Sequence, residues 1–134
     1  MTISVTGSED RPVKALVLRK KPVRLAGIVK IISFWIGAID GGKVDTRIVF
    51  ADIHGIEYKL FVGSADRPEW NRYSLAVDPM LPQSDYYLPV GFGGSFLGFE
   101  FTITGKGNVS FGIDSVAAIA YSPAPDQDAM QDGW

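Results

Sequence analysis

The residues of this chain that could carry acid–base or metal chemistry are few. His54 is the only histidine, and Asp52 lies two residues before it, so both side chains would share one side of a strand end. A zinc site needs three or four ligands, and the sequence offers no cysteine and no second histidine. We interpret His54 as a turn residue and expect no metal or cofactor. The sequence leaves open a cation held by backbone and aspartate oxygens, for example near Asp40, Asp45 or Asp66.

Hydrolytic chemistry has no stronger support. A Ser–His–Asp arrangement would have to use His54 with a serine such as Ser64 or Ser110, but no G-x-S-x-G elbow is present. Glu57 and Glu100 fall in predicted strands and could face each other as the paired carboxylates of a glycosidase. An outward glutamate is nevertheless the ordinary residue on the exposed side of a half-buried strand. The sequence therefore predicts a protein that is not an enzyme.

The stretch from 90 to 112 holds seven glycines, and glycine-rich runs can bind phosphate. A phosphate cradle needs a glycine-rich turn followed by a helix whose amino end faces the anion. Here a strand pattern follows, because apolar and polar residues alternate over 99–104. We interpret the three glycines of 91–94 as a loop passing over a sheet edge. Gly105 and Gly107 are interpreted as positive-φ residues of a hairpin at 105–108.

Aromatic residues near loops give a clearer signal of a binding surface. Trp70 lies in a loop expected at 64–71, and Tyr86 and Tyr87 follow a loop expected at 78–85. Aromatic side chains at loop tips stack on sugars or anchor protein interfaces. Alternation must bury one of two adjacent tyrosines, so Trp70 is the residue that we most expect at a working surface.

The elements that would position these residues are predicted to be strands. A chain of 134 residues with fifteen glycines and eight prolines indicates one turn-rich all-β domain. Residues 27–39 are β-branched and aromatic on both faces, which favours a strand at the centre of a sandwich or in a subunit interface. Gly41-Gly42 predicts a turn. His54-Gly55 predicts a two-residue hairpin between strands at 46–53 and 56–63.

We predict an antiparallel β-sandwich of the jelly-roll or immunoglobulin-like type. Its parts are an extended arm at 1–23 that can include a first strand, the sandwich domain at 24–123 and an acidic tail at 124–134. Further strands are expected at 12–20, 72–77, 86–90, 99–104 and 109–123. The apolar run at 25–39 is shorter than the roughly 20 residues of a membrane span, so we expect it to be buried in protein. The first residues show no signal-peptide pattern.

Charge is unevenly placed along the chain, although its net value is only −2. Seven basic residues and no acidic one lie between Arg11 and Lys30, and the residues after Pro123 are acidic. No aromatics interleave with the basic run, so nucleic acid is not the expected partner. The run is either a solvated face or a surface on which the acidic tail of another copy lies. Interface candidates are Lys20, Lys21 and Arg24, together with Trp134, a large apolar group at the end of a polar tail.

Four segments in this order, "PVRLAGIVKI", "ADIHGIEYKLFVG", "YYLPVGFGGSFLGFEFTITGKGNV" and "SVAAIAYSPA", carry a family resemblance. Over residues 24 to 123 the chain resembles a β-sandwich domain of tailed-bacteriophage virion proteins. That domain recurs near tail hubs and adaptors, often beside β-propeller tail proteins. Its role is assembly, so the resemblance transfers no catalytic residue. This chain has no propeller of its own, which leaves open its position at the tail tip, the neck or the head.

The resemblance implies a structural component of a tailed-phage virion, in the tail or its adaptor region, assembled in the host cytoplasm. Its partners would be copies of itself and other virion proteins. One alternative is a carbohydrate-binding module for host-surface recognition, with Trp70, Tyr86 and Tyr87 as its platform. A capsid decoration protein is another.

Overall fold

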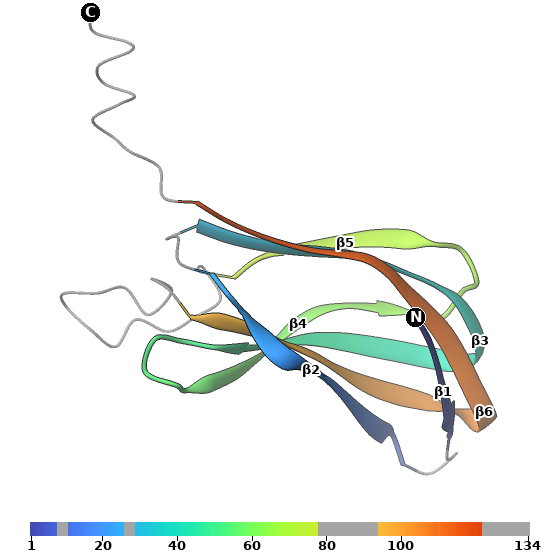
Figure 1. Ribbon diagram of the computed structural model, residues 1–134. Coiled ribbons are helices and arrows are strands. Elements are labelled where there is room, and N and C mark those ends of the chain that lie inside the picture. Colours follow the sequence, from blue (N-terminus) through green and yellow to red (C-terminus); the bar gives the residue numbers. More distant parts are fainter. Residues whose placement is uncertain (8–10, 26–28, 78–93, 122–134) are drawn as a thin grey trace, which may run out of the picture.

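The computed structural model describes residues 1–7, 11–25, 29–77 and 94–121, and within them the chain is an antiparallel β-sandwich without a helix (Figure 1). The predicted all-β antiparallel sandwich is confirmed. Its strands are β1 (Thr2–Thr6), β2 (Val13–Arg24), β3 (Val29–Ala51), β4 (Glu57–Ala65), β5 (Asn71–Ala76) and β6 (Ser95–Tyr121). No helix in this part of the chain is long and apolar enough to cross a membrane.

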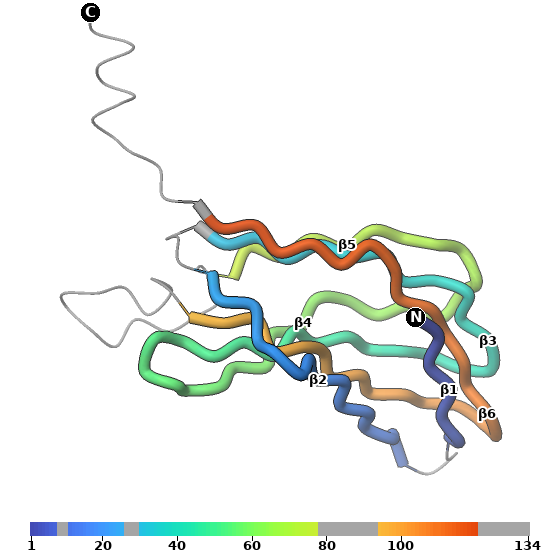
Figure 2. The backbone as a smooth tube through the Cα atoms, in the orientation of Figure 1, coloured from blue at the N-terminus to red at the C-terminus, as the bar shows by residue number. Residues whose placement is uncertain are grey.

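Two long strands, β3 and β6, run through both layers of the sandwich (Figure 2). They pair with each other in the lower layer, where Val44 faces Ile103, and again in the upper layer, where Ile32 faces Ala118. The register shifts between these two regions, close to Gly41, whose φ is 92°. Bulges and bends of this kind let one strand pass from one sheet to the next.

The turn predicted at Gly41-Gly42 and the hairpin predicted at 105–108 are therefore wrong. In both places the chain continues as the same strand, β3 or β6, and changes its direction without reversing. Gly107 adopts positive φ, as predicted, whereas Gly105, for which positive φ was also predicted, does not; Gly41 has positive φ at the other bend. The two bends lie side by side, since Gly42 pairs with Gly105, so both strands turn the corner together.

Four shorter strands complete the layers. In the lower layer β4 pairs with β3 and β2 pairs with the first part of β6, while in the upper layer β5 pairs with β3. β1 pairs with β6 from Asn108 to Gly112, at the corner. Residues 1–23, expected as an extended arm, thus contain two strands that pair with β6. The strand expected at 86–90 and the tail at 124–134 lie outside the described residues.

The core lies between the two layers and is rich in phenylalanine. Phe34 of the upper layer packs edge-on against Phe99 of the lower layer, with ring centroids 4.8 Å apart, and Phe101 meets Phe111 at 4.9 Å. Phe99, Phe101 and Ile103 are buried and share the inward face, as the alternation over 99–104 predicts, although Glu100 on the other face is buried as well. Burial of these large side chains is the main stabilising contribution.

Candidate functional site

Alternation along β3 places one tryptophan on the outside of the upper layer. Ile32, Phe34 and Ile36 point into the core and are fully buried, whereas Trp35 between them is 40% exposed. The run at 27–39 was expected to be apolar on both faces, and the structure shows that only one of these faces meets the core. The other carries a large aromatic side chain into solvent.

Trp70, the residue most expected at a surface, lies on the same outer face. It is 45% exposed, and the loop that carries it is held to β3 by a hydrogen bond from the Ala38 N–H to the Pro68 carbonyl of 2.8 Å. Its indole covers Gly37 and Gly112, which pair with each other across β3 and β6. A Cβ at Gly37 would lie 2.5 Å from the ring, so the missing side chains allow the ring to lie on the sheet.

The two tryptophans are neighbours within one apolar surface. Trp35 and Gly37 are two residues apart on one strand and therefore point to the same side, which puts the ring of Trp70 next to Trp35. Farther along the layer, Ile119 of β6 is 54% exposed and pairs with the half-buried Ile31 of β3. We call this surface the tryptophan face; it consists of Ile31, Trp35, Trp70, Ala76, Ala117 and Ile119.

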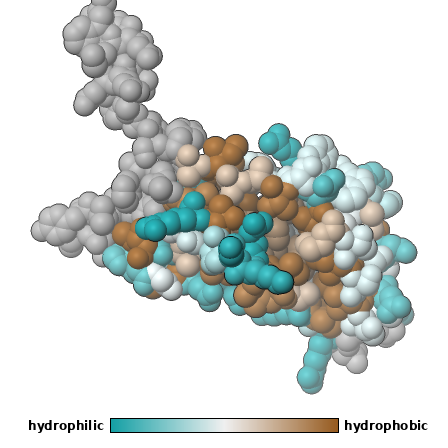
Figure 3. Space-filling model, in the orientation of Figure 1, coloured by the Kyte–Doolittle hydropathy of each residue, from teal (hydrophilic) through white to brown (hydrophobic). Residues whose placement is uncertain are grey.

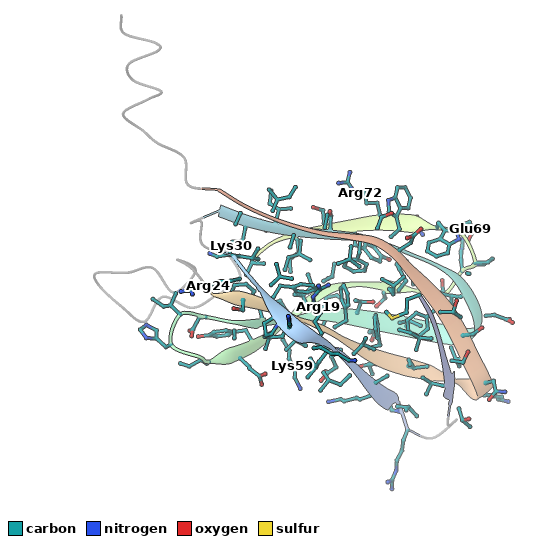
Figure 4. All side chains as sticks on the ribbon, viewed as in Figure 1. Arg19, Arg24, Lys30, Lys59, Glu69 and Arg72 are labelled. Atoms are coloured by element: carbon teal, nitrogen blue, oxygen red, sulfur yellow. The ribbon has the colours of Figure 1, made fainter. Side chains whose placement is uncertain are left out.

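Charged groups border this face. Arg72 of β5 and Asp114 of β6 are both exposed and are the cross-strand partners of Trp35 on its two sides. Figure 4 shows the side chain of Arg72 projecting away from the upper layer. Beside Trp70 lies a hollow of about 420 Å³, with Thr2, Ser110 and Asp114 among its lining residues. An apolar centre with a polar border is the general anatomy of a binding surface.

The basic candidates lie elsewhere. Lys20, Lys21 and Arg24 are exposed on β2, which belongs to the lower layer. The register between β2 and β6 shifts between Leu18 and Val23, so the residues between them leave the ladder. The structure does not bring these cations to Trp70. The remaining interface candidates, Tyr86, Tyr87 and Trp134, lie outside the described residues.

Asp52, considered above for catalysis together with His54, makes hydrogen bonds that stabilise a turn. Asp52 accepts hydrogen bonds from the N–H groups of His54 at 2.8 Å and Ile56 at 3.0 Å, and so shapes the turn between β3 and β4. The hairpin predicted here is confirmed, but its connection runs from Asp52 to Ile56 and is longer than the two residues predicted. Tyr58 donates to the same carboxylate at 3.3 Å, and its pKa is raised by desolvation and by the charge of Asp52.

Glu100 is a buried ion-pair partner. Its carboxylate lies 2.7 Å from the Lys59 ammonium, and it is only 5% exposed. The hydrogen bond from Lys59 lowers the pKa of Glu100, against the opposing effect of burial, and the charges of Lys59, Lys14 and Arg47 lower it further. Glu57 pairs with Ala51 and Glu100 with Arg47, so the two glutamates are not opposite each other.

Within the described ranges, no group of three or more histidine, aspartate or glutamate side chains could hold a metal ion. Trp35 was missed as a candidate by sequence reasoning. Its position in the alternation with Phe34 and Ile36 marked it as facing away from them, but the sequence did not show that nothing would cover that side.

The sequence matches no family model, and no curated protein matches it. Its fold is similar to infectious bursal disease virus structures: to the VP2 subviral particle with a TM-score of 0.57 and 10% identity over 90% of this chain, and to the Gx strain with 0.55 and 12% over 87%. The chain spans only 30% and 28% of those two viral chains. A family 11 carbohydrate-binding module of Clostridium thermocellum aligns over 92% of this chain and 90% of its own length, with 11% identity and a TM-score of only 0.40.

Proposed function

We propose that this chain is a structural subunit of a virus particle, in the tail or tail-adaptor region of a tailed phage. It acts by binding copies of itself and other virion proteins through the tryptophan face. The observation that carries this proposal is the exposure of Trp35, Trp70 and Ile119 on one face of the upper layer. Single exposed apolar residues are normal, but a set on one face, with charged residues at its border, is typical of an interface.

The similarity of the fold to infectious bursal disease virus structures also supports a role in a virus particle. VP2 of the infectious bursal disease virus subviral particle shares this sandwich fold with most of the chain. The sequence resemblance to tailed-phage virion domains supports the tail or its adaptor region, and a capsid decoration protein would use the same surface at a different place on the particle. Assembly in the host cytoplasm and a role without catalysis belong to this proposal.

The test compares the tryptophan face with an equally exposed aromatic elsewhere. Phe61 is 47% exposed and belongs to the lower layer, so Phe61→Ala is the matched control for Trp35→Ala and Trp70→Ala. We expect the double variant Trp35→Ala/Trp70→Ala to lose incorporation into purified particles by at least about tenfold, since interface anchors contribute about 2 kcal/mol or more each. Phe61→Ala should be incorporated normally. Normal incorporation of a folded double variant would overturn the proposal.

A second candidate function, glycan binding, is favoured by the hollow beside Trp70. Its lining combines an indole with the hydroxyl groups of Thr2 and Ser110 and the carboxylate of Asp114. An aromatic ring stacks on a sugar while polar groups fix its hydroxyls. Calorimetric titration with host-surface glycans separates the two functions. Binding that Trp70→Ala abolishes and Phe61→Ala retains would support this candidate, and no heat at millimolar sugar would remove it.

A further inference from the structure

One edge of the sandwich ends without a partner strand. β3 covers one side of β6 as far as Tyr121, but β1 covers the other side only to Gly112, and the Met1 and Ile113 main chains exchange two hydrogen bonds of 2.8 Å at that point. Among the strands that the structure describes, none pairs with residues 116–121 on this second side. Every second residue of such a segment directs its N–H and C=O away from the sheet, where they can pair with another strand.

This edge lacks the features with which proteins usually protect free edges. Residues 116–121 read VAAIAY, with no charge and no proline, and Val116 and Ile119 are exposed. The edge strand β2 carries charges, a proline and a register shift, all of which discourage pairing with another chain: Lys14, Arg19, Lys20, Lys21 and Pro22. β4 carries Lys59 at its edge and β5 carries Arg72.

The surroundings of the edge are apolar. A hollow of about 240 Å³ lies between this part of β6 and β2, with Val17, Phe96, Phe99 and Val116 among its lining residues. Figure 3 shows hydrophobic side chains gathered along this side of the molecule, with hydrophilic ones over β2. Ala118 and Ala120 pack against the core with short side chains, so a strand added beside them can bring its own side chains into the hollow.

We propose that two copies of this chain join along residues 116–121 of β6 in antiparallel register, so that their upper layers form one continuous sheet. A two-fold axis would match this segment with itself, which is the self-complementary contact of a symmetric dimer. An uncharged segment meets no like charge in its copy, whereas the β2, β4 and β5 edges of a second copy would bring lysine or arginine to it. The added strand would continue the line of β1, which already covers β6 up to this point. This inference rests on the proposed function, one of whose partners it names, but it uses a different surface.

The experiment uses two exposed alanines of the upper layer. Ala117 lies on the free edge and Ala76 on the opposite edge, in β5, and both are on the tryptophan face. Ala117→Lys should raise the dimer dissociation constant by about tenfold or more in sedimentation equilibrium, because like charges would meet across the axis. Ala76→Lys, on the same face but at the opposite edge, should have a much smaller effect. An effect that acts through the tryptophan face alone would change both variants equally, and that result would overturn the edge proposal.

Hydrogen exchange of the unmodified protein gives an independent measurement. The amides in 116–121 that point away from β3 should become protected as the concentration rises through the dimer dissociation constant. A monomer at all concentrations, or protection that is already complete in the monomer, would overturn the proposal, the latter because another segment of the same chain would then occupy the edge. An oligomer without protection at 116–121 would also overturn it, while leaving the proposed function intact. If Trp35→Ala/Trp70→Ala is not incorporated into particles but still dimerises, the tryptophan face and the β6 edge act as separate binding surfaces.

Discussion

The indole of Trp70 rests on the backbone of Gly112, where a Cβ would lie 2.6 Å from the far end of the ring. The same ring covers Gly37, where a Cβ would also meet the Trp70 main chain, 2.8 Å from its Cα. Two glycines on paired strands thus hold open the place in which Trp70 lies. The tryptophan face depends on this pair, because a side chain at either position would push the indole away from the sheet.

Gly37→Ala should destabilise the protein by about 1–3 kcal/mol, the usual cost of overpacking, since the new methyl group meets the backbone of the Trp70 loop. Gly112→Ala should cost less, because only the end of a side chain has to move. Urea unfolding measures both. The Trp70→Ala background is the control: Gly112→Ala should be nearly neutral there, and an equal loss with and without the indole would show that Trp70 is not the cause.

Phe34 and Trp35 are adjacent in sequence and opposite in role. Phe34→Ala removes a fully buried ring and should cost about 3–5 kcal/mol in the free energy of unfolding. Trp35→Ala removes a ring that is partly in solvent and should cost about 1 kcal/mol, while weakening association. Chemical denaturation of the dilute protein checks the difference. A loss for Trp35→Ala as large as that for Phe34→Ala would place Trp35 in the fold rather than in the interface.

The ion pair of Glu100 and Lys59 should make stability depend on acid. Lys59 lowers the pKa of Glu100 in the folded protein, so this contribution is complete above the ordinary glutamate pKa of about 4.3 and is lost as the pH falls through the lower, folded value. Glu100→Gln should lower the free energy of unfolding by about 1 kcal/mol at neutral pH, a modest figure because Lys59 is half exposed. The same variant should reduce the acid limb, which is the loss of stability as the pH falls below about 4.3. Lys59→Met should flatten it similarly. Thermal melts from pH 7 to pH 3 measure this, and an unchanged acid limb in Glu100→Gln would contradict it.

Asp52 holds the turn between β3 and β4 through two backbone N–H groups. Asp52→Ala should cost about 1–3 kcal/mol, because those donors lose their acceptor, whereas Asp52→Asn keeps one oxygen and should cost less. Asp66→Ala, in the exposed loop after β4, is the matched control and should stay within about 0.5 kcal/mol of the unmodified protein. Urea unfolding orders the three variants. Equal stability of Asp52→Ala and Asp66→Ala would show that the turn does not need this carboxylate.

Much of the predicted fold follows from the alternation of apolar and polar residues along each strand. The buried Phe99, Phe101 and Ile103, and the loop before the strand that holds Tyr73, follow from period two and from turn residues, which act over a few positions. Ile56 falls in the strand expected at 56–63, but it is exposed and precedes β4, because the turn extends to it. The length of that turn follows from the side-chain bonds of Asp52, which periodicity does not report.

The sequence by itself determined that the chain forms strands, which of their faces are apolar and that a strand follows Gly94, because these are properties of neighbouring residues. Only the tertiary structure decided whether Gly41 and Gly107 reverse or bend the chain. Glycine permits both, and the pairing of β3 with β6 on each side of the corner selects the bend. Only the tertiary structure decided, too, that Glu100 is buried and Trp35 exposed, since each depends on which distant side chains cover that position, and strand period alone cannot report this.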